Sequence, residues 1–343
     1  MTLKKFAMSF LLAFLFLSSA FANDQNEPFF KSGDAQCSIW GYASITGGSE
    51  QDFMGAPIRT RTSCTYKKFS FFMENDLSGL DSRIPANYIT QGWVGYNFGK
   101  EGLAGNFFSN TTIRAGSLIT AGGLYLPPAY MAISIESPHN PLFHAYGYGV
   151  QVETKITPNL TFVGDVTGTT GPAFNDPKRF DRTETSQRLI WDAVKDKTTG
   201  LPELQLSVSN QWSSESQRIG FGAMYRATKD LDLYGGIYRS DEHPRDGKAS
   251  IGHGGYALAD YKLWSMEGNK LDLRIMGMFN KTVGDTDYTS YSAGPSLVLP
   301  KEGGYGRFGG SSVTVDFSHS DTKAPGVPET TDNAIMTRVR IFF

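Results

Sequence analysis

The chain has 343 residues and a formal net charge of −2, so it lacks the basic character that nucleic-acid binding generally requires. Aromatic residues make up 13% of the chain and 38 residues are glycine, a composition that suits a large β-protein.

The first 22 residues have the pattern of a secretory signal peptide. Two basic residues, Lys4 and Lys5, precede the apolar run Phe6–Leu17, and Ala20-Phe21-Ala22 follows as a small-residue cleavage site. An N-terminal membrane anchor is the alternative, but the apolar run is short for a spanning helix. We therefore expect cleavage after Ala22 and export of the mature chain.

Apolar and polar residues alternate along most of the mature chain, which is the pattern of strands with one apolar and one polar face. Fourteen segments show it clearly: Cys37–Ile45, Phe69–Met73, Tyr88–Phe98, Thr111–Thr120, Tyr146–Ile156, Leu160–Val166, Leu204–Val208, Ile219–Tyr225, Leu231–Ile237, Gly254–Met266, Leu271–Ile275, Thr289–Leu299, Val313–Phe317 and Met336–Phe343.

The lengths of the connections test this count of strands. In transmembrane barrels the short turns lie at one end and the long loops at the other. With fourteen strands the tight turn Thr157–Asn159 falls at the end of the long loops, whereas Thr228–Asp230 and Glu267–Lys270 fall correctly. Two further strands, Ala129–Glu136 and Thr185–Val194, repair the fault, although Thr185–Val194 also fits a helix. We expect an all-β, transmembrane antiparallel β-barrel of sixteen strands, with fourteen as the alternative. A long loop is expected at Ser320–Ile335.

The last predicted strand has a pattern that is characteristic of one class of proteins. Ile341 and Phe343 share an apolar face, Arg338 and Arg340 lie on the opposite face, and the chain ends on an aromatic residue. Together with the signal peptide and the alternating strands, this resembles the closing strand of bacterial outer-membrane barrels, and the whole mature chain resembles general porins and porin-like channels.

The resemblance implies a bacterial outer-membrane location in contact with lipid, with both termini in the periplasm. Residues 23–36 would form a short periplasmic segment and residues 37–343 the barrel. Phe343 would be the signal read by the barrel-assembly machinery, and a homotrimer is typical of the class. The implied function is a water-filled channel for passive diffusion of small hydrophilic solutes or ions. A structural or adhesive barrel is the alternative, and a soluble secreted β-sandwich or propeller is the alternative fold.

Parity along the strands assigns charged residues to the inner face of the barrel. Nine basic and six acidic residues have this inward parity. The excess of basic residues predicts a channel with a mild preference for anions, unless these charges neutralise one another across the lumen. The expected pore-lining residues are Arg114, Arg218, Arg226, Arg274, Arg338, Arg340, Asp165, Asp232, Asp272 and Asp316, with Lys68, Lys155, Lys262, Glu153 and Asp260 on the same face.

Porins commonly fold one outer loop into the lumen as a constriction. Two stretches are candidates, Ser137–Phe143 and Gly168–Glu184. The second contains Asp176, Asp181 and Glu184, which would face Arg114, Arg338 and Arg340 on the wall. On the inner face, Tyr234, Tyr238 and Tyr256 are candidates for a sugar-binding surface, with packing as the alternative.

Catalytic motifs are not apparent. His319 and Ser320 are adjacent, so in a strand their side chains point to opposite faces. No Gly-x-Ser-x-Gly elbow, phosphate-binding loop, dinucleotide fingerprint or zinc-type spacing occurs. We expect no enzyme, no cofactor and no metal site; a barrel hydrolase is the less favoured alternative. The two cysteines, Cys37 and Cys64, leave a disulfide open.

Overall fold

The structure is a computed structural model. It describes residues 28–48, 58–76, 88–101, 110–122, 146–169, 183–197, 200, 202–243, 249–266, 271–299 and 311–342. The proposed signal peptide, Ser137–Phe143, Asp176, Asp181 and Phe343 lie outside these ranges.

The described chain is all β apart from one short 3-10 helix, η1 (Gly99–Glu101). Its strands are β1 (Phe30–Ser32), β2 (Ala35–Gly48), β3 (Ile58–Tyr66), β4 (Phe69–Asp76), β5 (Tyr88–Asn97), β6 (Thr112–Ile119), β7 (Tyr146–Thr157), β8 (Leu160–Thr169), β9 (Thr183–Lys195), β10 (Pro202–Ser213), β11 (Ser216–Arg226), β12 (Leu231–Glu242), β13 (Ser250–Met266), β14 (Leu271–Val283), β15 (Asp287–Val298), β16 (Ser312–Lys323) and β17 (Thr330–Phe342).

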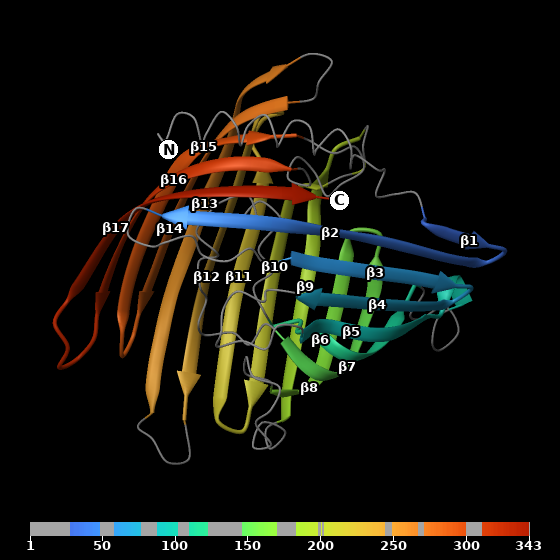
Figure 1. The fold of residues 1–343 in the computed structure, drawn as a ribbon. Coiled ribbons are helices and arrows are strands. Elements are labelled where there is room, and N and C mark those ends of the chain that lie inside the picture. Colours follow the sequence, from blue (N-terminus) through green and yellow to red (C-terminus); the bar gives the residue numbers. More distant parts are fainter. Residues whose placement is uncertain are drawn as a thin grey trace.

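Strands β2 to β17 form a closed antiparallel ring. Each strand pairs with its neighbours in the sequence, and β17 closes the ring on β2, from Met336 opposite Gly48 to Phe342 opposite Tyr42. Figure 1 shows this order, with β17 (red) lying beside β2 (blue). Closure satisfies the backbone hydrogen bonds that an open sheet edge would leave exposed. The prediction of an antiparallel barrel with sixteen strands is confirmed.

One of the two added strands differs from the prediction. β9 covers Thr185–Val194 as a strand, not a helix, but the other strand is β3. Its sequence, Ile-Arg-Thr-Arg-Thr-Ser-Cys-Thr-Tyr, has too few apolar residues to show clear alternation. Ala129–Glu136 lies outside the described residues, and β6 and β7 on either side of it pair directly with each other, so the ring is complete without a strand between them.

The two ends of the barrel are named here by where the first and last strands of the ring begin and end. β2 begins and β17 ends at one end, the near end, which also carries the tight turn at Pro158–Asn159. The opposite, far end carries the turns at residues 214–215 and 284–286. The predicted long loop at Ser320–Ile335 is much shorter, because β16 and β17 continue to Lys323 and from Thr330.

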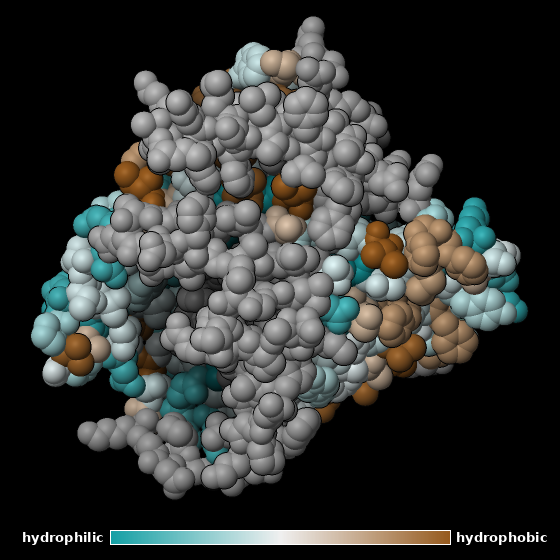
Figure 2. All heavy atoms as spheres, in the orientation of Figure 1, coloured by the Kyte–Doolittle hydropathy of each residue, from teal (hydrophilic) through white to brown (hydrophobic). Residues whose placement is uncertain are grey.

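Alternation of exposure along each strand separates the outer from the inner face. In β12, Leu233 and Ile237 are exposed, whereas Asp232, Tyr234 and Tyr238, which have the opposite parity, are buried. The same alternation leaves Phe69, Phe71 and Val94 exposed on β4 and β5. Figure 2 shows apolar side chains gathered on the right of this view, over the part of the sheet where β3, β4 and β5 lie. The outer face is thus mainly apolar and the inner face mainly polar.

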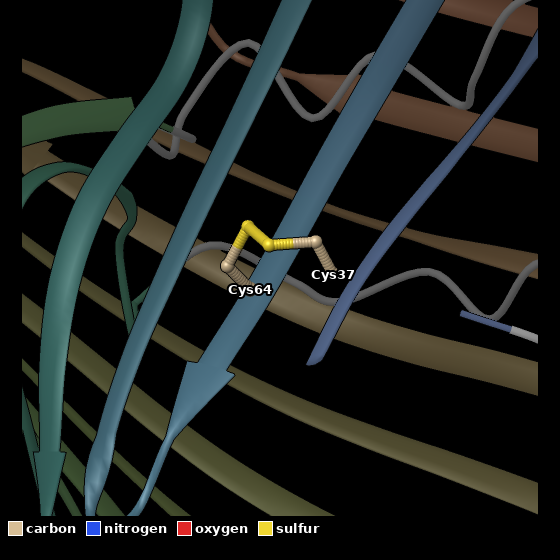
Figure 3. The surroundings of a disulfide bond; sticks show 2 residues. All are labelled: Cys37 and Cys64. Atoms are coloured by element: carbon tan, nitrogen blue, oxygen red, sulfur yellow. A yellow bond between two sulfur atoms is a disulfide. The ribbon is translucent and has the colours of Figure 1, made fainter. Parts of the chain in front are cut away.

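A disulfide joins β2 and β3. Cys37 and Cys64 lie directly opposite each other in the antiparallel register and are bonded through their sulfur atoms (Figure 3). The register of the hairpin therefore decides the question that the cysteine spacing left open. β2 continues beyond the last residue paired with β17, and β1 pairs with residues 35–37 of this extension.

Candidate functional site

Six inward-facing side chains follow one another across neighbouring strands from β6 to β11. Residues directly opposite in adjacent strands share a face of the sheet, so the pairing register places them in one line. This line, here called the lumenal row, consists of Arg114, Gln151, Asp165, Ser186, Gln211 and Arg218.

Hydrogen bonds connect most neighbours within the lumenal row. Arg114 Nη1 donates to Gln151 Oε1 at 3.0 Å, and Asp165 and Ser186 are hydrogen-bonded through their side chains. Gln211 Nε2 donates to Ser186 Oγ at 3.3 Å, and Arg218 Nη1 donates to Gln211 Oε1 at 3.1 Å. Because both partners of each bond are fixed by the wall, the row is a rigid surface of donors and acceptors.

The chain that leaves β6 docks on this row. The backbone N–H of Ala121 donates to Asp165 Oδ2 at 2.5 Å. Gln151 Nε2 donates to the carbonyl oxygen of Ile119 at 2.8 Å, and Gln211 Nε2 approaches Thr120 Oγ1 at 3.5 Å. The connection from β6 to β7 therefore begins by turning inward against the wall.

Gly122 is needed for this close approach. A Cβ atom placed on Gly122 would lie 2.6 Å from Cβ of Gln211 and 3.2 Å from Cβ of Ser186. Real Cβ contacts are not this short, so any larger residue has to move the segment away from the row. The predicted constriction candidate Ser137–Phe143 belongs to this same connection, although it lies outside the described residues.

The ten residues expected to line the pore all lie on the inner face. Arg274 is fully buried and binds Asp260, with Nε to Oδ1 at 2.8 Å and Nη2 to Oδ2 at 2.5 Å, and its Nη1 lies 3.6 Å from Asp272 Oδ2. Asp232 lies opposite Asp260 and pairs with Arg226 at 3.3 Å. Asp232 and Asp260 are thus two adjacent acids, and each is compensated by an arginine on its other side, Arg226 on β11 and Arg274 on β14.

Glu184 differs from its predicted place in a loop. It lies within strand β9, is buried, and its Oε1 is 3.2 Å from Arg218 Nη1. Arg218 also pairs through Nη2 with Glu242 Oε1 at 2.8 Å. Glu184 is therefore a wall residue that holds Arg218 at the end of the lumenal row.

The remaining predicted residues lie on β16 and β17. Asp316, Arg338 and Arg340 are buried, and the guanidinium carbon of Arg340 is 5.0 Å from the centre of the Tyr42 ring. The register adds further inward-facing charges to those predicted, the acids Glu74, Glu184 and Glu242 and the bases Arg61 and Arg188. The additions narrow the expected excess of bases over acids.

Sequence reasoning missed the neutral members of the site. Gln151, Ser186 and Gln211 carry no charge, so a search for lumenal charges passes over them. Their inward parity within β7, β9 and β10 is the one signal that was present in the sequence. Their contact with the chain after β6 depends on strand order, which no local pattern contains.

The described ranges contain no cluster of metal-ligand type. No group of three or more histidine, cysteine, aspartate or glutamate residues there could hold a metal ion. His319 and Ser320 are neighbours in β16 and therefore point to opposite faces. No helix in the described part of the chain is long and apolar enough to cross a membrane.

The fold resembles solved outer-membrane barrels. The channel DcaP of Acinetobacter baumannii matches with a TM-score of 0.62 at 10% identity, over 92% of this chain and 99% of that one. The outer-membrane protein OmpT of Vibrio cholerae matches with a TM-score of 0.59 at 10% identity, over 92% and 99% of the two chains. An anion-selective porin from Comamonas acidovorans matches with a TM-score of 0.57 at 11% identity, over 90% and 100%.

Comparison of the sequence with known families and proteins does not assign this chain to a family. No protein-family model matches the chain, and no curated protein matches it. At identities of 10–11% the structural matches show the fold alone, a closed porin-like β-barrel.

Proposed function

We propose that this protein is a bacterial outer-membrane porin, a channel for passive diffusion of small hydrophilic solutes. One observation carries the proposal: a closed ring of sixteen strands with a polar inner face, on which the connection after β6 docks at Asp165. A barrel of this strand number encloses an interior wide enough for water.

The proposal includes how the protein is exported and assembled in the outer membrane. Residues 1–22 act as the cleaved signal peptide and residues 23–36 as a short periplasmic segment before the barrel. The near end of the barrel faces the periplasm, and Phe343 is read there by the barrel-assembly machinery. The apolar outer face contacts lipid, and the working assembly is a homotrimer.

The selectivity of the channel is weak in this proposal. Ion pairs such as Arg274 with Asp260 and Arg226 with Asp232 neutralise charge locally, so they contribute little to the long-range field in the lumen. A mild anion preference remains the expected direction because arginines outnumber acids on β17, where Arg338 and Arg340 occur together.

Single-channel conductance of the refolded protein in planar bilayers tests the proposal, with the reversal potential measured in a salt gradient. Discrete conductance steps with a small anion-directed reversal potential are expected. Cation selectivity would keep the channel and overturn the charge assignment. A correctly folded barrel without conductance, or one that hydrolyses ester or peptide substrates, would overturn the porin function.

A further inference from the structure

A second group of inward-facing side chains combines flat aromatic rings with arginine–glutamate ion pairs. Trp40 and Arg61 are directly opposite on β2 and β3, and Phe72 and Trp93 are directly opposite on β4 and β5. The group, here called the aromatic strip, consists of Trp40, Arg61, Phe72, Trp93, Arg114 and Glu153. It includes Arg114 from the lumenal row and extends from it toward β2.

The rings of the strip are held in place by their neighbours. The guanidinium carbon of Arg61 is 4.5 Å from the centre of the Trp40 ring, and that of Arg114 is 5.1 Å from the centre of the Trp93 ring. Phe72 stacks on Trp93 with ring centres 5.5 Å apart and an interplanar angle of 21°. Cation–π and stacking contacts of this kind fix the rings, so little conformational freedom is lost when a solute binds them.

Glycines occupy the positions around Trp93 on the same face. Gly116 lies opposite Trp93, Gly149 lies opposite Gly116, and Gly95 is the next inward residue on β5. A Cβ atom at Gly95 would lie 3.2 Å from the Trp93 ring. Glycine has no side chain, so these three positions do not cover the Trp93 ring. Trp93 and Phe72 are partly exposed.

The charges of the strip are compensated in ion pairs, Arg61 with Glu74 on β4 and Arg114 with Glu153. Arg114 Nη2 is 2.8 Å from Glu153 Oε2, and both side chains are accessible, at 23% and 36% exposure. An anion meets repulsion from Glu153, and a cation meets repulsion from Arg114. A hydroxyl group can accept from Arg114 and donate to Glu153, so the pair suits an uncharged solute with several hydroxyls.

We propose that the aromatic strip binds sugars, uncharged polyhydroxylated rings whose apolar face packs on Trp93 and Phe72 while hydroxyls bridge Arg114 and Glu153. This inference rests on the proposed channel function and gives that channel a substrate class. The surface differs from the one predicted by sequence, because Tyr234, Tyr238 and Tyr256 are all buried. Tyr238 Oη lies 2.6 Å from Thr282 Oγ1, so that hydroxyl already has a partner in the wall.

The test measures ionic current through the full-length protein in planar bilayers while maltotriose is added. We expect a saturable decrease in current for the wild-type channel. Trp93→Ala should raise the half-blocking concentration about tenfold, since one aromatic contact is lost, whereas Trp93→Phe keeps a stacking ring and should stay close to wild type. Trp191→Ala is the matched control, because Trp191 lies on the outer face and is exposed.

The outcomes separate the two proposals. Normal conductance without block by maltotriose, or block that Trp93→Ala leaves unchanged, overturns sugar binding and leaves the channel function standing. Block by benzoate but not by maltotriose also overturns it and assigns the strip to aromatic anions. A folded wild-type barrel without any conductance overturns the channel function and this inference together. Folding of each variant is checked by its heat-modifiable migration on gels.

Discussion

The backbone N–H of Ala121 donates a 2.5 Å hydrogen bond to Oδ2 of Asp165, which joins the chain leaving β6 to the inner face of β8. The two residues are 44 positions apart. The contact makes Asp165 an anchor for residues 120–122, the described segment that follows β6, a role more specific than that of a charge lining the pore.

Replacing Asp165 should release this connection. In Asp165→Ala the Ala121 N–H and the Ser186 hydroxyl lose a charged partner, at a cost of about 1.5–3 kcal/mol. We expect larger and noisier single-channel currents in planar bilayers. Asp165→Asn keeps an acceptor oxygen and should show a smaller change. A folded Asp165→Ala channel with wild-type conductance and noise would show that other contacts hold the connection.

Gly122 should be sensitive to any larger side chain. Gly122→Val places atoms against Gln211 and Ser186, so the segment has to leave the lumenal row and the conductance should change as in Asp165→Ala. Gly277→Ala is the matched control, because no atom lies within 4 Å of a Cβ at that position. Equal currents for the two variants would contradict the close docking of Gly122.

The buried pair of Arg274 and Asp260 should contribute strongly to stability. Arg274→Met leaves the Asp260 carboxylate buried without its bidentate partner, and the loss should be about 3–5 kcal/mol. The exposed pair of Arg239 and Asp241 provides a control, since Arg239→Met should cost about 0–1 kcal/mol. Urea unfolding in lipid vesicles measures the free energy of unfolding of both variants. If Arg274→Met lowers it no more than Arg239→Met does, the buried pair does not stabilise the barrel strongly.

The disulfide between Cys37 and Cys64 should stabilise the first hairpin. It closes a loop with a sequence separation of 27, for which chain entropy predicts about 3–4 kcal/mol. We expect the Cys37→Ser, Cys64→Ser double variant to unfold at lower urea concentration than the oxidised protein. Addition of a reductant should shift the wild type toward the variant and leave the variant unchanged; equal midpoints before and after reduction would argue against a stabilising role.

His319 should titrate above its ordinary pKa. The outward-facing apolar residues of β16 end at Phe317, so the ring of His319 lies beyond the apolar band. The ring is hydrogen-bonded to Asn333 at 2.7 Å and to Asp321 at 3.0 Å, and these bonds raise the pKa of His319 by favouring the protonated ring. Hydrogen bonds from Thr331 and His319 lower the pKa of Asp321. The stabilising effect of protonated His319 is therefore present at low pH and is lost as the pH rises through the folded-state pKa.

An NMR titration of the imidazole signals measures this value. Asp321→Asn removes the carboxylate and should move the His319 pKa back toward 6.5. An unchanged midpoint in that variant would assign the shift to Asn333 alone.

Much of the barrel wall could be predicted from the sequence, because strand alternation is a local property. The period of two placed Arg274, Asp232 and Arg338 on the inner face without reference to any partner. The lengths of the connections then favoured sixteen strands, since short and long turns segregate to opposite ends of a barrel. β3 escaped detection because its outward positions are mostly threonine and cysteine.

The tertiary structure alone decided which residues meet. Pairing register between distant strands brought Cys37 opposite Cys64, aligned Gln151, Asp165 and Gln211 in one row, and placed Ala121 against it. It also moved Glu184 from a predicted loop into the wall beside Arg218. Such contacts depend on strand order, tilt and closure of the ring, which are set by the pairing of all sixteen strands together and leave no trace in a local sequence pattern.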